Sequence, residues 1–392
     1  MNQSPAPRNT VQGKRRRKEN VRGMIFNPYE VAFSGYRNSG KTTLVTKLIA
    51  SLGGDHDVGY VKHDRHRFNM DVDGKDTKRA ADAGARTVWI NDGDHAARIH
   101  FGETRKFERL TAMQEADFVL AEGYKKSDML KVVVIDEKEE ILSAGLENII
   151  AYAGASHQPP HSLRQDIPYF CRDDIEGIEA LIMARWAEQT TAMPLKGLVL
   201  TGGKSSRMRE DKSAMQYHGV SQTQFVYDQL TAVTSECYVS TRVEQAGDPD
   251  KASLPQVHDT ILGAGPTGGI LSAMHLSPEA AWLVVACDLP YLEPLTLRAL
   301  LGARDPFKTA TAFRSAHDGL PEPLCAVYEP KARYRLCQFM GLGYTCPRKV
   351  LINSNIKLLE QRNPRWLDNV NTPDEHRAAM SGMPGRSRVE AP

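Results

Sequence analysis

The stretch Glu30-Val31-Ala32-Phe33-Ser34-Gly35-Tyr36-Arg37-Asn38-Ser39-Gly40-Lys41-Thr42 joins a short apolar run to a glycine-rich loop. From Gly35 to Thr42 it fits the pattern G-x-x-x-x-G-K-[ST] at every fixed position. In such a phosphate-binding loop (P-loop), glycines let backbone N–H groups surround a phosphate, lysine supplies charge and the hydroxyl ligates Mg²⁺. The stretch therefore predicts a strand, a P-loop and a helix at the start of a parallel α/β sheet.

Short apolar runs alternate with helical patterns on both sides of a polar stretch at 188–194. Before that stretch we expect strands at 30–34, 58–61, 87–90, 118–121, 131–135 and 149–152, and helices at 41–52, 75–84 and 175–186. After it, strands are expected at 196–200, 237–240 and 282–286. Alternation at these lengths is typical of parallel βαβ units. The polar stretch therefore separates two α/β domains.

The length of 392 residues supports this division, because a single hydrophobic core seldom grows so large. We place a flexible basic tail at 1–23, a P-loop domain at 24–193, a second domain at 194–380 and a flexible tail at 381–392. The two halves show no convincing repeat, which indicates a fusion of different domains rather than a duplication.

The composition excludes several classes of function. A formal net charge of +2 gives no general electrostatic case for nucleic-acid or membrane binding. The six cysteines form no CxxC pair and no tight cluster, so we expect neither a zinc knuckle nor a disulfide framework. No apolar run approaches the roughly 20 residues of a membrane span. We therefore expect a cytoplasmic protein with reduced thiols. The basic run 14–18 fits either an anionic partner or, as we favour, a solvated tail.

An acidic residue that completes the Mg²⁺ shell of the P-loop is expected at the end of another parallel strand. Glu122 holds that position after the apolar run 118–121. Between the two lies a polar cluster that includes Asp71, Asp73 and Asp76. From spacing alone this cluster is either a set of metal ligands or a solvated loop, and the loop is favoured.

The second half opens with its own glycine-rich loop after a strand, at 200–212. Gly202 and Gly203 let the backbone approach a triphosphate, and Lys204, Arg207 and Lys212 add three cations within one short segment. A basic surface loop is the alternative interpretation.

Asp288 follows the apolar strand 282–287, which predicts a carboxylate at the carboxyl edge of a parallel sheet, where open α/β folds bind ligands and where Mg²⁺ fits naturally. The turn at 265–269, preceded by Asp259, offers a second close approach of backbone to ligand. The stretch 369–373 fits either a ligand contact or, from spacing alone, a helix cap.

Four segments of the first half, at 35–43, 61–63, 71–76 and 120–125, together resemble the molybdopterin-guanine dinucleotide biosynthesis adapter proteins (MobB type) over about 30–186. The resemblance implies a GTP-binding domain, usually dimeric, that assists a guanylyltransferase without catalysing the transfer. It implies ligand contacts from Gly35, Asn38, Ser39, Gly40, Lys41, Thr42, Thr43, Asp73, Lys75, Asp76 and Glu122, with Thr42 on the metal.

The motifs of the second half, at 200–212, 259, 265–269, 287–290 and 369–373, together resemble the molybdenum cofactor guanylyltransferases (MobA type) over about 195–379. The resemblance implies catalytic roles for Arg207, Lys212 and Asp288, with Mg²⁺ on Asp288. GTP contacts are implied for Leu200, Thr201, Gly202, Gly203, Lys212, Asp259, Gly265 and Gly269, and pterin or phosphate contacts for Asn369 and Asn371. Arg209 stands where the family usually has glycine, and Ser240 and Thr241 stand where some members carry a nucleotide-contacting asparagine.

Together the resemblances imply an α/β protein with an N-terminal P-loop NTPase-like parallel sheet and a C-terminal Rossmann-like nucleotidyltransferase domain. The implied reaction transfers GMP from GTP to molybdopterin or Mo-molybdopterin with Mg²⁺ and releases pyrophosphate. Implied partners are a second copy of the chain, through the N-terminal domain, and a molybdoenzyme or molybdenum-insertion protein. Two alternatives stay open: transfer from CTP or to another acceptor, and a P-loop GTPase switch or pterin delivery module.

Overall fold

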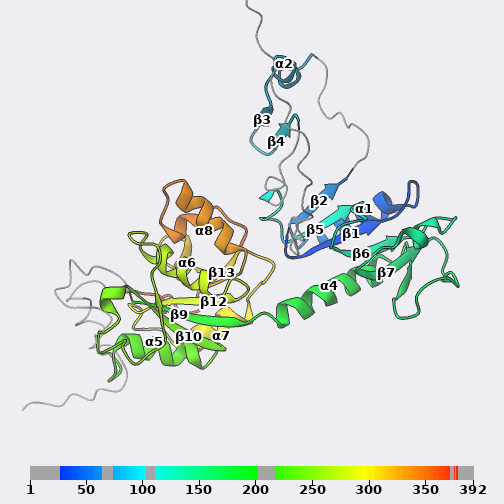
Figure 1. The fold of residues 1–392 in the computed structure, drawn as a ribbon. Coiled ribbons are helices and arrows are strands. Elements are labelled where there is room, and N and C mark those ends of the chain that lie inside the picture. Colours follow the sequence, from blue (N-terminus) through cyan, green and yellow to red (C-terminus); the bar gives the residue numbers. More distant parts are fainter. Residues whose placement is uncertain are drawn as a thin grey trace, which may run out of the picture.

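The computed structural model describes residues 27–63, 74–102, 111–201, 217–370, 375 and 377. Among these residues the chain forms two large α/β units and a small hairpin unit (Figure 1). This arrangement confirms the α/β class expected from the sequence. No helix in the described ranges is long and apolar enough to cross a membrane.

The first unit is a six-stranded sheet in the order β2-β5-β1-β6-β7-β8, and every neighbouring pair is parallel. Its strands are β1 Glu30–Ser34, β2 Val58–Lys62, β5 Phe118–Glu122, β6 Leu130–Val134, β7 Ile149–Gly154 and β8 Tyr169–Cys171. Helices α1 Lys41–Leu52 and α4 Ile175–Thr191 pack on each other, and η1 Glu140–Ala144 is a short 3₁₀ turn. Their apolar faces bury Leu44, Leu48 and Trp186 against Phe33 and Phe118 of the sheet.

The second unit is a seven-stranded mixed sheet in the order β11-β10-β9-β12-β14-β13-β15, in which β14 runs antiparallel to both of its neighbours. Its strands are β9 Leu195–Leu200, β10 Glu236–Thr241, β11 Gln256–His258, β12 Ala281–Ala286, β13 Ala310–Arg314, β14 Pro321–Tyr328 and β15 Ile356–Leu359. Its helical segments are α5 Gln222–Thr231, α6 Pro266–Leu276, α7 Pro294–Gly302, α8 Ala332–Gly341, α9 Pro347–Ile352 and η3 Val243–Gln245.

The central strands of this mixed sheet are buried on both faces because helices cover both. Along β12, Trp282 and Val284 join a core with α6, α8 and α9, whereas Leu283 and Val285 join the opposite core with α5 and α7. Side chains alternate between the two faces of a strand, so a continuous apolar run is what such a strand requires.

The hairpin unit corrects one expectation. The segment 87–90 was expected to be a parallel strand, but β3 Thr87–Asn91 pairs antiparallel with β4 Ala96–His100 in a separate two-stranded sheet, beside α2 Asp76–Asp82. The Asp92-Gly93-Asp94 turn explains this pairing, since the Asp92 carboxylate accepts hydrogen bonds from the amides of Asp94 and His95 and closes a tight reversal. A strand that reverses at once cannot feed a parallel crossover.

The polar stretch 188–194 was also expected to interrupt the helical pattern, but α4 continues through it to Thr191. Glutamate, glutamine and alanine are good helix formers, so polarity alone does not end a helix here. Only three residues, 192–194, then separate α4 from β9. The connection between the two sheets is therefore short and largely helical.

Candidate functional site

The first candidate site lies at the carboxyl end of β1, where the P-loop connects the strand to α1. Gly40 precedes the helix with φ 87°, a left-handed conformation that favours glycine. A Cβ on Gly35 would lie 2.5 Å from the Val134 carbonyl oxygen, so that position has no room for a side chain. These two constraints explain why the loop carries glycine at both ends of its pattern.

Lys41 folds back over the loop, where its Nζ donates to the Tyr36 carbonyl oxygen and to Ser39 Oγ at 3.2 Å. Burial lowers the pKa of Lys41, although the nearby Glu122 carboxylate opposes that shift. In this arrangement the Lys41 ammonium group is bonded to the loop itself, and a bound phosphate would compete with the loop oxygens for it.

Glu122, at the end of β5, connects that strand to the neighbouring β2 and to the first turn of α1. Its Oε2 accepts hydrogen bonds from Thr42 Oγ1 at 2.9 Å and from the Tyr60 hydroxyl at 2.8 Å, and its Oε1 lies 3.3 Å from Lys62 Nζ. Burial alone raises the pKa of this carboxyl, but the bonds from Tyr60 and Thr42 and the Lys62 charge outweigh it and hold the pKa below its usual value. A charged carboxylate next to the Thr42 hydroxyl is an oxygen pair of the kind that Mg²⁺ prefers.

Two residues of this site were not predicted from the sequence. Tyr60 donates to Glu122, and Arg172 Nη1 donates to the Ser39 carbonyl oxygen at 2.7 Å, directly after β8. The next residue, Asp173, pairs with Lys47 of α1 at 2.7 Å. The short run Tyr169-Phe170-Cys171 ahead of an acidic helix start was the available signal for a further strand and hence for Arg172 at the same edge.

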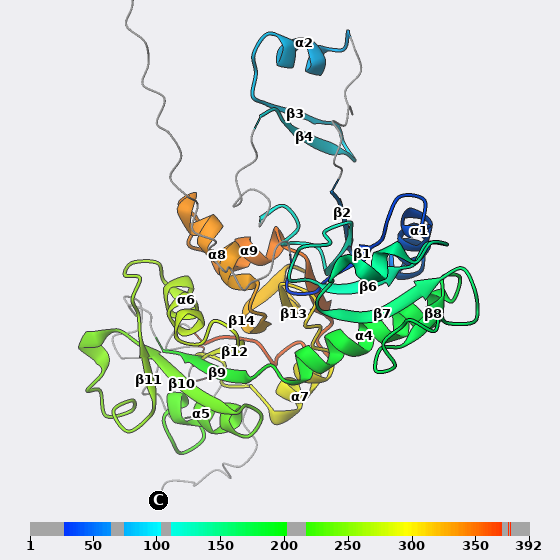
Figure 2. The ribbon, with the colours of Figure 1, turned by 45° about the vertical axis from the view of Figure 1, so that its right-hand side comes forward.

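The structure does not bring every predicted residue of this half together. Lys75 and Asp76 lie at the start of α2, which stands apart from the P-loop and α1 in both views of the molecule (Figures 1 and 2). Thr43 is exposed on the first turn of α1. Asp73 lies outside the described residues. The contribution of these residues to a ligand site stays a prediction.

The second candidate site lies at the carboxyl edge of the mixed sheet, where β9 is flanked by β10 and β12. Leu200 pairs with Ser240 on one side and with Ala286 on the other, and its carbonyl oxygen accepts the Cys287 amide at 3.1 Å. Thr201 Oγ1 donates to the Ser240 carbonyl oxygen at 2.7 Å. The chain leaves β9 toward β10 and enters β12 on its other side, which is the switch point where open α/β sheets bind ligands.

Asp259 and Gly269 meet at this edge. Asp259 Oδ1 accepts a hydrogen bond from Ser240 Oγ at 2.8 Å, and a Cβ on Gly269 would lie 2.3 Å from that same Oγ. Burial raises the pKa of Asp259, against the opposing effects of Ser240, Arg242 and His258. Gly265 caps α6 with φ 57°, and Thr267 donates to the Thr345 carbonyl oxygen at 2.8 Å. Glycine at 269 therefore keeps the Ser240–Asp259 contact possible.

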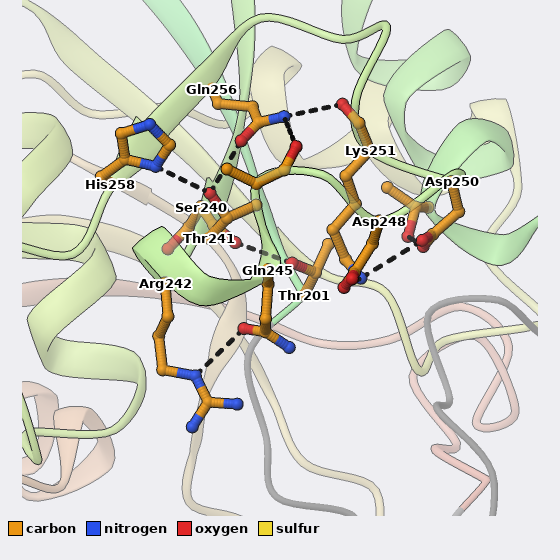
Figure 3. A network of polar contacts seen from close by, with 12 residues as sticks. Thr201, Ser240, Thr241, Arg242, Gln245, Asp248, Asp250, Lys251, Gln256 and His258 are labelled. Atoms are coloured by element: carbon orange, nitrogen blue, oxygen red, sulfur yellow. Dashed lines mark hydrogen bonds and ion pairs between the residues drawn. The ribbon is translucent and has the colours of Figure 1, made fainter.

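A polar network holds the segment that connects β10 to β11, next to these residues (Figure 3). Thr241 Oγ1 contacts Gln256 Oε1 at 3.0 Å and His258 Nδ1 at 3.1 Å, while Gln256 Nε2 donates to the Lys251 carbonyl oxygen at 2.9 Å. The Lys251 side chain is fully buried and pairs with Asp248 at 3.0 Å and Asp250 at 3.3 Å. The network fixes the ends of β10 and β11, next to the Ser240–Asp259 contact.

Asp288 and Asn369 also reach this edge. Asp288 lies two residues after β12, and its carbonyl oxygen accepts the Val370 amide at 3.2 Å, which brings the exposed Asn369 beside it. Burial and then the Asp288 charge raise the pKa of the neighbouring Tyr217 to about 12. Asp288 supplies carboxylate oxygens at the switch point, a donor type that fits Mg²⁺. Within the described ranges no group of three or more His, Cys, Asp or Glu side chains gathers as a metal site.

The remaining predicted residues of this half, Gly202, Gly203, Arg207, Lys212 and Asn371, lie outside the described residues. Those that the structure describes do converge: Leu200, Thr201, Asp259, Gly265, Gly269, Asp288 and Asn369 all lie at one edge of the mixed sheet.

The fold and the candidate sites at the carboxyl edges of the two sheets define a class of protein: a P-loop domain joined to an α/β nucleotidyltransferase domain. Comparison with known proteins gives the same class for both domains. Residues 31–155 match the family model described as Molybdopterin guanine dinucleotide synthesis protein B, and residues 197–355 match the MobA-like NTP transferase domain. The chain belongs to the molybdenum cofactor biosynthesis proteins and contains both a MobB domain and a MobA-like nucleotidyltransferase domain.

Three relatives illustrate the likeness. A "Probable molybdopterin-guanine dinucleotide biosynthesis adapter protein" of Bacillus subtilis is 34% identical over 38% of this chain and 88% of its own length. A "Probable molybdenum cofactor guanylyltransferase" of Pelotomaculum thermopropionicum is 28% identical over 46% of this chain and 88% of its own. A "Molybdenum cofactor biosynthesis bifunctional protein" of Synechocystis is 34% identical over 47% of this chain, and the match spans only 53% of that relative.

Proposed function

We propose that the C-terminal domain transfers GMP from GTP to molybdopterin, or to Mo-molybdopterin, and releases pyrophosphate. The observation that carries this proposal is the convergence of Leu200, Asp259, Gly269 and Asp288 at the switch point of a sheet that matches the MobA-like transferase domain. The guanylyltransferase relative supports the choice of GTP as donor.

The chemistry explains why this site holds a carboxylate, glycines and cations. A phosphate oxygen of molybdopterin forms a bond to the α-phosphorus of GTP, the bond from that phosphorus to the bridging oxygen breaks, and pyrophosphate leaves with the electron pair. The attacking phosphate has a second pKa of about 6, so it is already an oxyanion at neutral pH and needs no general base. The main obstacle is repulsion between anions, which positioning and charge neutralisation overcome.

Each residue then has a proposed task. Gly265 leaves room for a nucleotide, Gly269 keeps Ser240 against Asp259, and Asn369 binds the pterin or its phosphate near Asp288. Mg²⁺ held by Asp288 would neutralise charge on the α-phosphate and the departing pyrophosphate. Arg207 and Lys212, which follow β9 in the sequence, are proposed to balance the remaining phosphate charge.

We further propose that the N-terminal domain binds GTP at the P-loop and assists the transferase as an adapter. Three observations support this role. Lys41 Nζ lies against the P-loop at Ser39, and Thr42 donates a hydrogen bond to Glu122. In addition, residues 31–155 match the MobB family model. Homodimerisation through the same domain is part of the proposal. The β3–β4 hairpin supports it, because Trp89 and Ile90 are 63% and 52% exposed there and give a second chain an apolar strand to bind.

Product identification tests the transferase proposal. The full chain is incubated with molybdopterin, Mg²⁺ and each nucleoside triphosphate in turn, and the product is identified by mass. We expect the guanine dinucleotide with GTP. A protein that binds molybdopterin but forms no dinucleotide with any triphosphate would instead be a delivery module.

A further inference from the structure

The two domains of one chain are docked through a specific interface. Phe307, in the loop before β13, enters an aromatic cluster of the N-terminal domain, with its ring centroid 4.8 Å from Tyr29, 5.8 Å from Phe118 and 6.2 Å from Trp186. These contacts continue the N-terminal core across the domain boundary. Aromatic pairs of this geometry stabilise beyond their buried area alone.

Polar contacts anchor the same interface. The fully buried Asp117 accepts Lys308 Nζ at 2.6 Å and Asn355 Nδ2 at 2.9 Å from the C-terminal domain. Lys331 Nζ, also buried, donates to the Ala116 carbonyl oxygen at 3.0 Å, and Arg335 pairs with Glu115 at 2.7 Å. Buried charges that are paired across an interface fix its geometry, because separating them leaves unpaired charges. The docking is therefore well defined.

The interface joins the amino ends of both sets of parallel strands. On the N-terminal side, Tyr29 precedes β1 and residues 115–117 precede β5. On the C-terminal side, residues 304–309 precede β13 and Asn355 precedes β15. A cavity of about 530 Å³ lies in this joint, lined by residues of both domains that include Pro28, Tyr29, Gln189, Met193, Glu329 and Lys331.

Both candidate nucleotide sites lie at the opposite, carboxyl ends of the strands. The P-loop follows β1, Leu200 ends β9, and Asp288 follows β12. Each site is thus one strand length, about 17 to 20 Å for five or six residues, behind its side of the interface. Figures 1 and 2 show the same arrangement. Helix α1, which follows the P-loop, and helix α6, which follows Gly265, lie on opposite sides of the connection from α4 to β9.

We infer that the P-loop site of one chain acts on the transferase site of a second copy of the chain, because back-to-back docking turns the two sites of one chain away from each other. This inference rests on the proposed adapter function. Within one chain, cooperation would require the Phe307 contacts and the Asp117 pairs to break at each turnover. Between chains, the carboxyl edge of the P-loop domain of one chain meets the carboxyl edge of the transferase domain of the other. The Phe307 and Asp117 contacts inside each chain then stay intact.

Complementation between two variants, one changed at the P-loop and the other at the transferase site, tests the inference. Full-length Lys41→Ala, which loses P-loop charge, is mixed with full-length Asp288→Asn, which loses the transferase carboxylate. The control mixture pairs Lys41→Ala with the double variant Lys41→Ala/Asp288→Asn at the same total concentration. At limiting molybdopterin we expect the first mixture to be faster than the control by about threefold or more, because a coupling of about fivefold, the lower end of the ordinary range, acts only on the half of the Lys41→Ala chains that meet an Asp288→Asn partner.

Equal rates in the two mixtures, with wild type faster than Lys41→Ala alone, would overturn the inference and place the cooperation within one chain. Equal rates for wild type and Lys41→Ala at limiting molybdopterin would remove the adapter function itself, and the inference with it. Dilution of the wild-type protein gives an independent measurement that needs no variant. We expect the rate per chain to fall on dilution, and a rate that stays constant down to concentrations where the chains are monomeric would also overturn the inference.

Discussion

The two candidate sites are built in different ways. The P-loop site takes Gly35, Lys41 and Thr42 from one continuous segment and adds Glu122 from a neighbouring strand. The transferase site collects its described residues from five segments between Leu200 and Asn369. A contiguous loop tolerates changes elsewhere in its domain, whereas a dispersed site depends on the packing of the whole sheet. The two sites should therefore respond differently to substitution.

The largest expected effect separates chemistry from folding at the dispersed site. Asp288→Asn keeps size and hydrogen bonding but removes the charge that would hold Mg²⁺, so turnover should fall by roughly a thousandfold or more. The melting temperature should stay near that of wild type. Asp228→Asn on α5, whose carboxylate accepts a bond from Gln224, is the matched control. Activity of Asp288→Asn within about tenfold of wild type would mean that Asp288 merely caps the turn before Leu289.

The next effect tests whether the contiguous site is independent. Lys41→Ala removes the ammonium group that meets phosphate charge, so GTP affinity at the P-loop should fall by roughly a hundredfold, as calorimetric titration of the full chain would measure. Transfer at saturating molybdopterin should change far less. The control is Lys47→Ala on the same helix, which loses the Asp173 pair instead. Loss of transfer at saturation, with the fold intact, would mean that the two sites form one functional unit.

A smaller effect is expected where the dispersed site depends on packing. Gly269→Ala places a Cβ within 2.3 Å of Ser240 Oγ, so Ser240 must turn away from Asp259 and the KM for GTP should rise by about tenfold. The double variant Gly269→Ala/Ser240→Ala removes the clashing hydroxyl, and its KM should rise by less than the product of the two single fold-changes, which is the rise that additive free energies would give. Gly302→Ala, where a Cβ meets nothing within 4 Å, is the control. Strict additivity would contradict the proposed contact.

The smallest effect concerns the charge of Glu122. Its folded-state pKa lies below the ordinary value near 4.5, so its charged form stabilises the fold above that value. This stability is lost as the pH falls through the folded pKa. Thermal unfolding of Glu122→Gln should therefore depend less on pH than wild type below about 4.5 and differ little in slope above it. Parallel curves for the two proteins through that range would show that Glu122 is not held as a carboxylate.

Local sequence predicted the contiguous site and only part of the dispersed one. The strand, loop and helix at Glu30–Ser34, 35–40 and Lys41–Leu52 were predicted correctly, because the motif itself specifies their geometry. Asp288 and Asp259 were identified by their positions after apolar strands. The convergence of Leu200, Gly269 and Asn369 depends on strand order, which periodicity alone does not give. The family resemblance supplied it, and the matches to both family models confirmed that resemblance.

Three features escaped prediction for identifiable physical reasons. Arg172 depends on β8, whose three residues are too short for a periodic signal. The β3 segment looks like any apolar strand until its turn at Asp92 closes the hairpin. Phe307 lies in a polar loop after Asp305-Pro306, where nothing in the local sequence indicates a partner core more than a hundred residues away. Interfaces between domains are tertiary facts that local propensity does not encode.

The most direct test of the central claim, that the dispersed site transfers GMP, is a competition in one reaction. The full chain is given equimolar GTP and CTP with limiting molybdopterin and Mg²⁺, and the two possible dinucleotides are quantified by mass spectrometry. The proposed function predicts that the guanine product predominates in wild type and that both products disappear in Asp288→Asn. An equal or larger yield of the cytosine product, or dinucleotide formation that persists in Asp288→Asn, would contradict it.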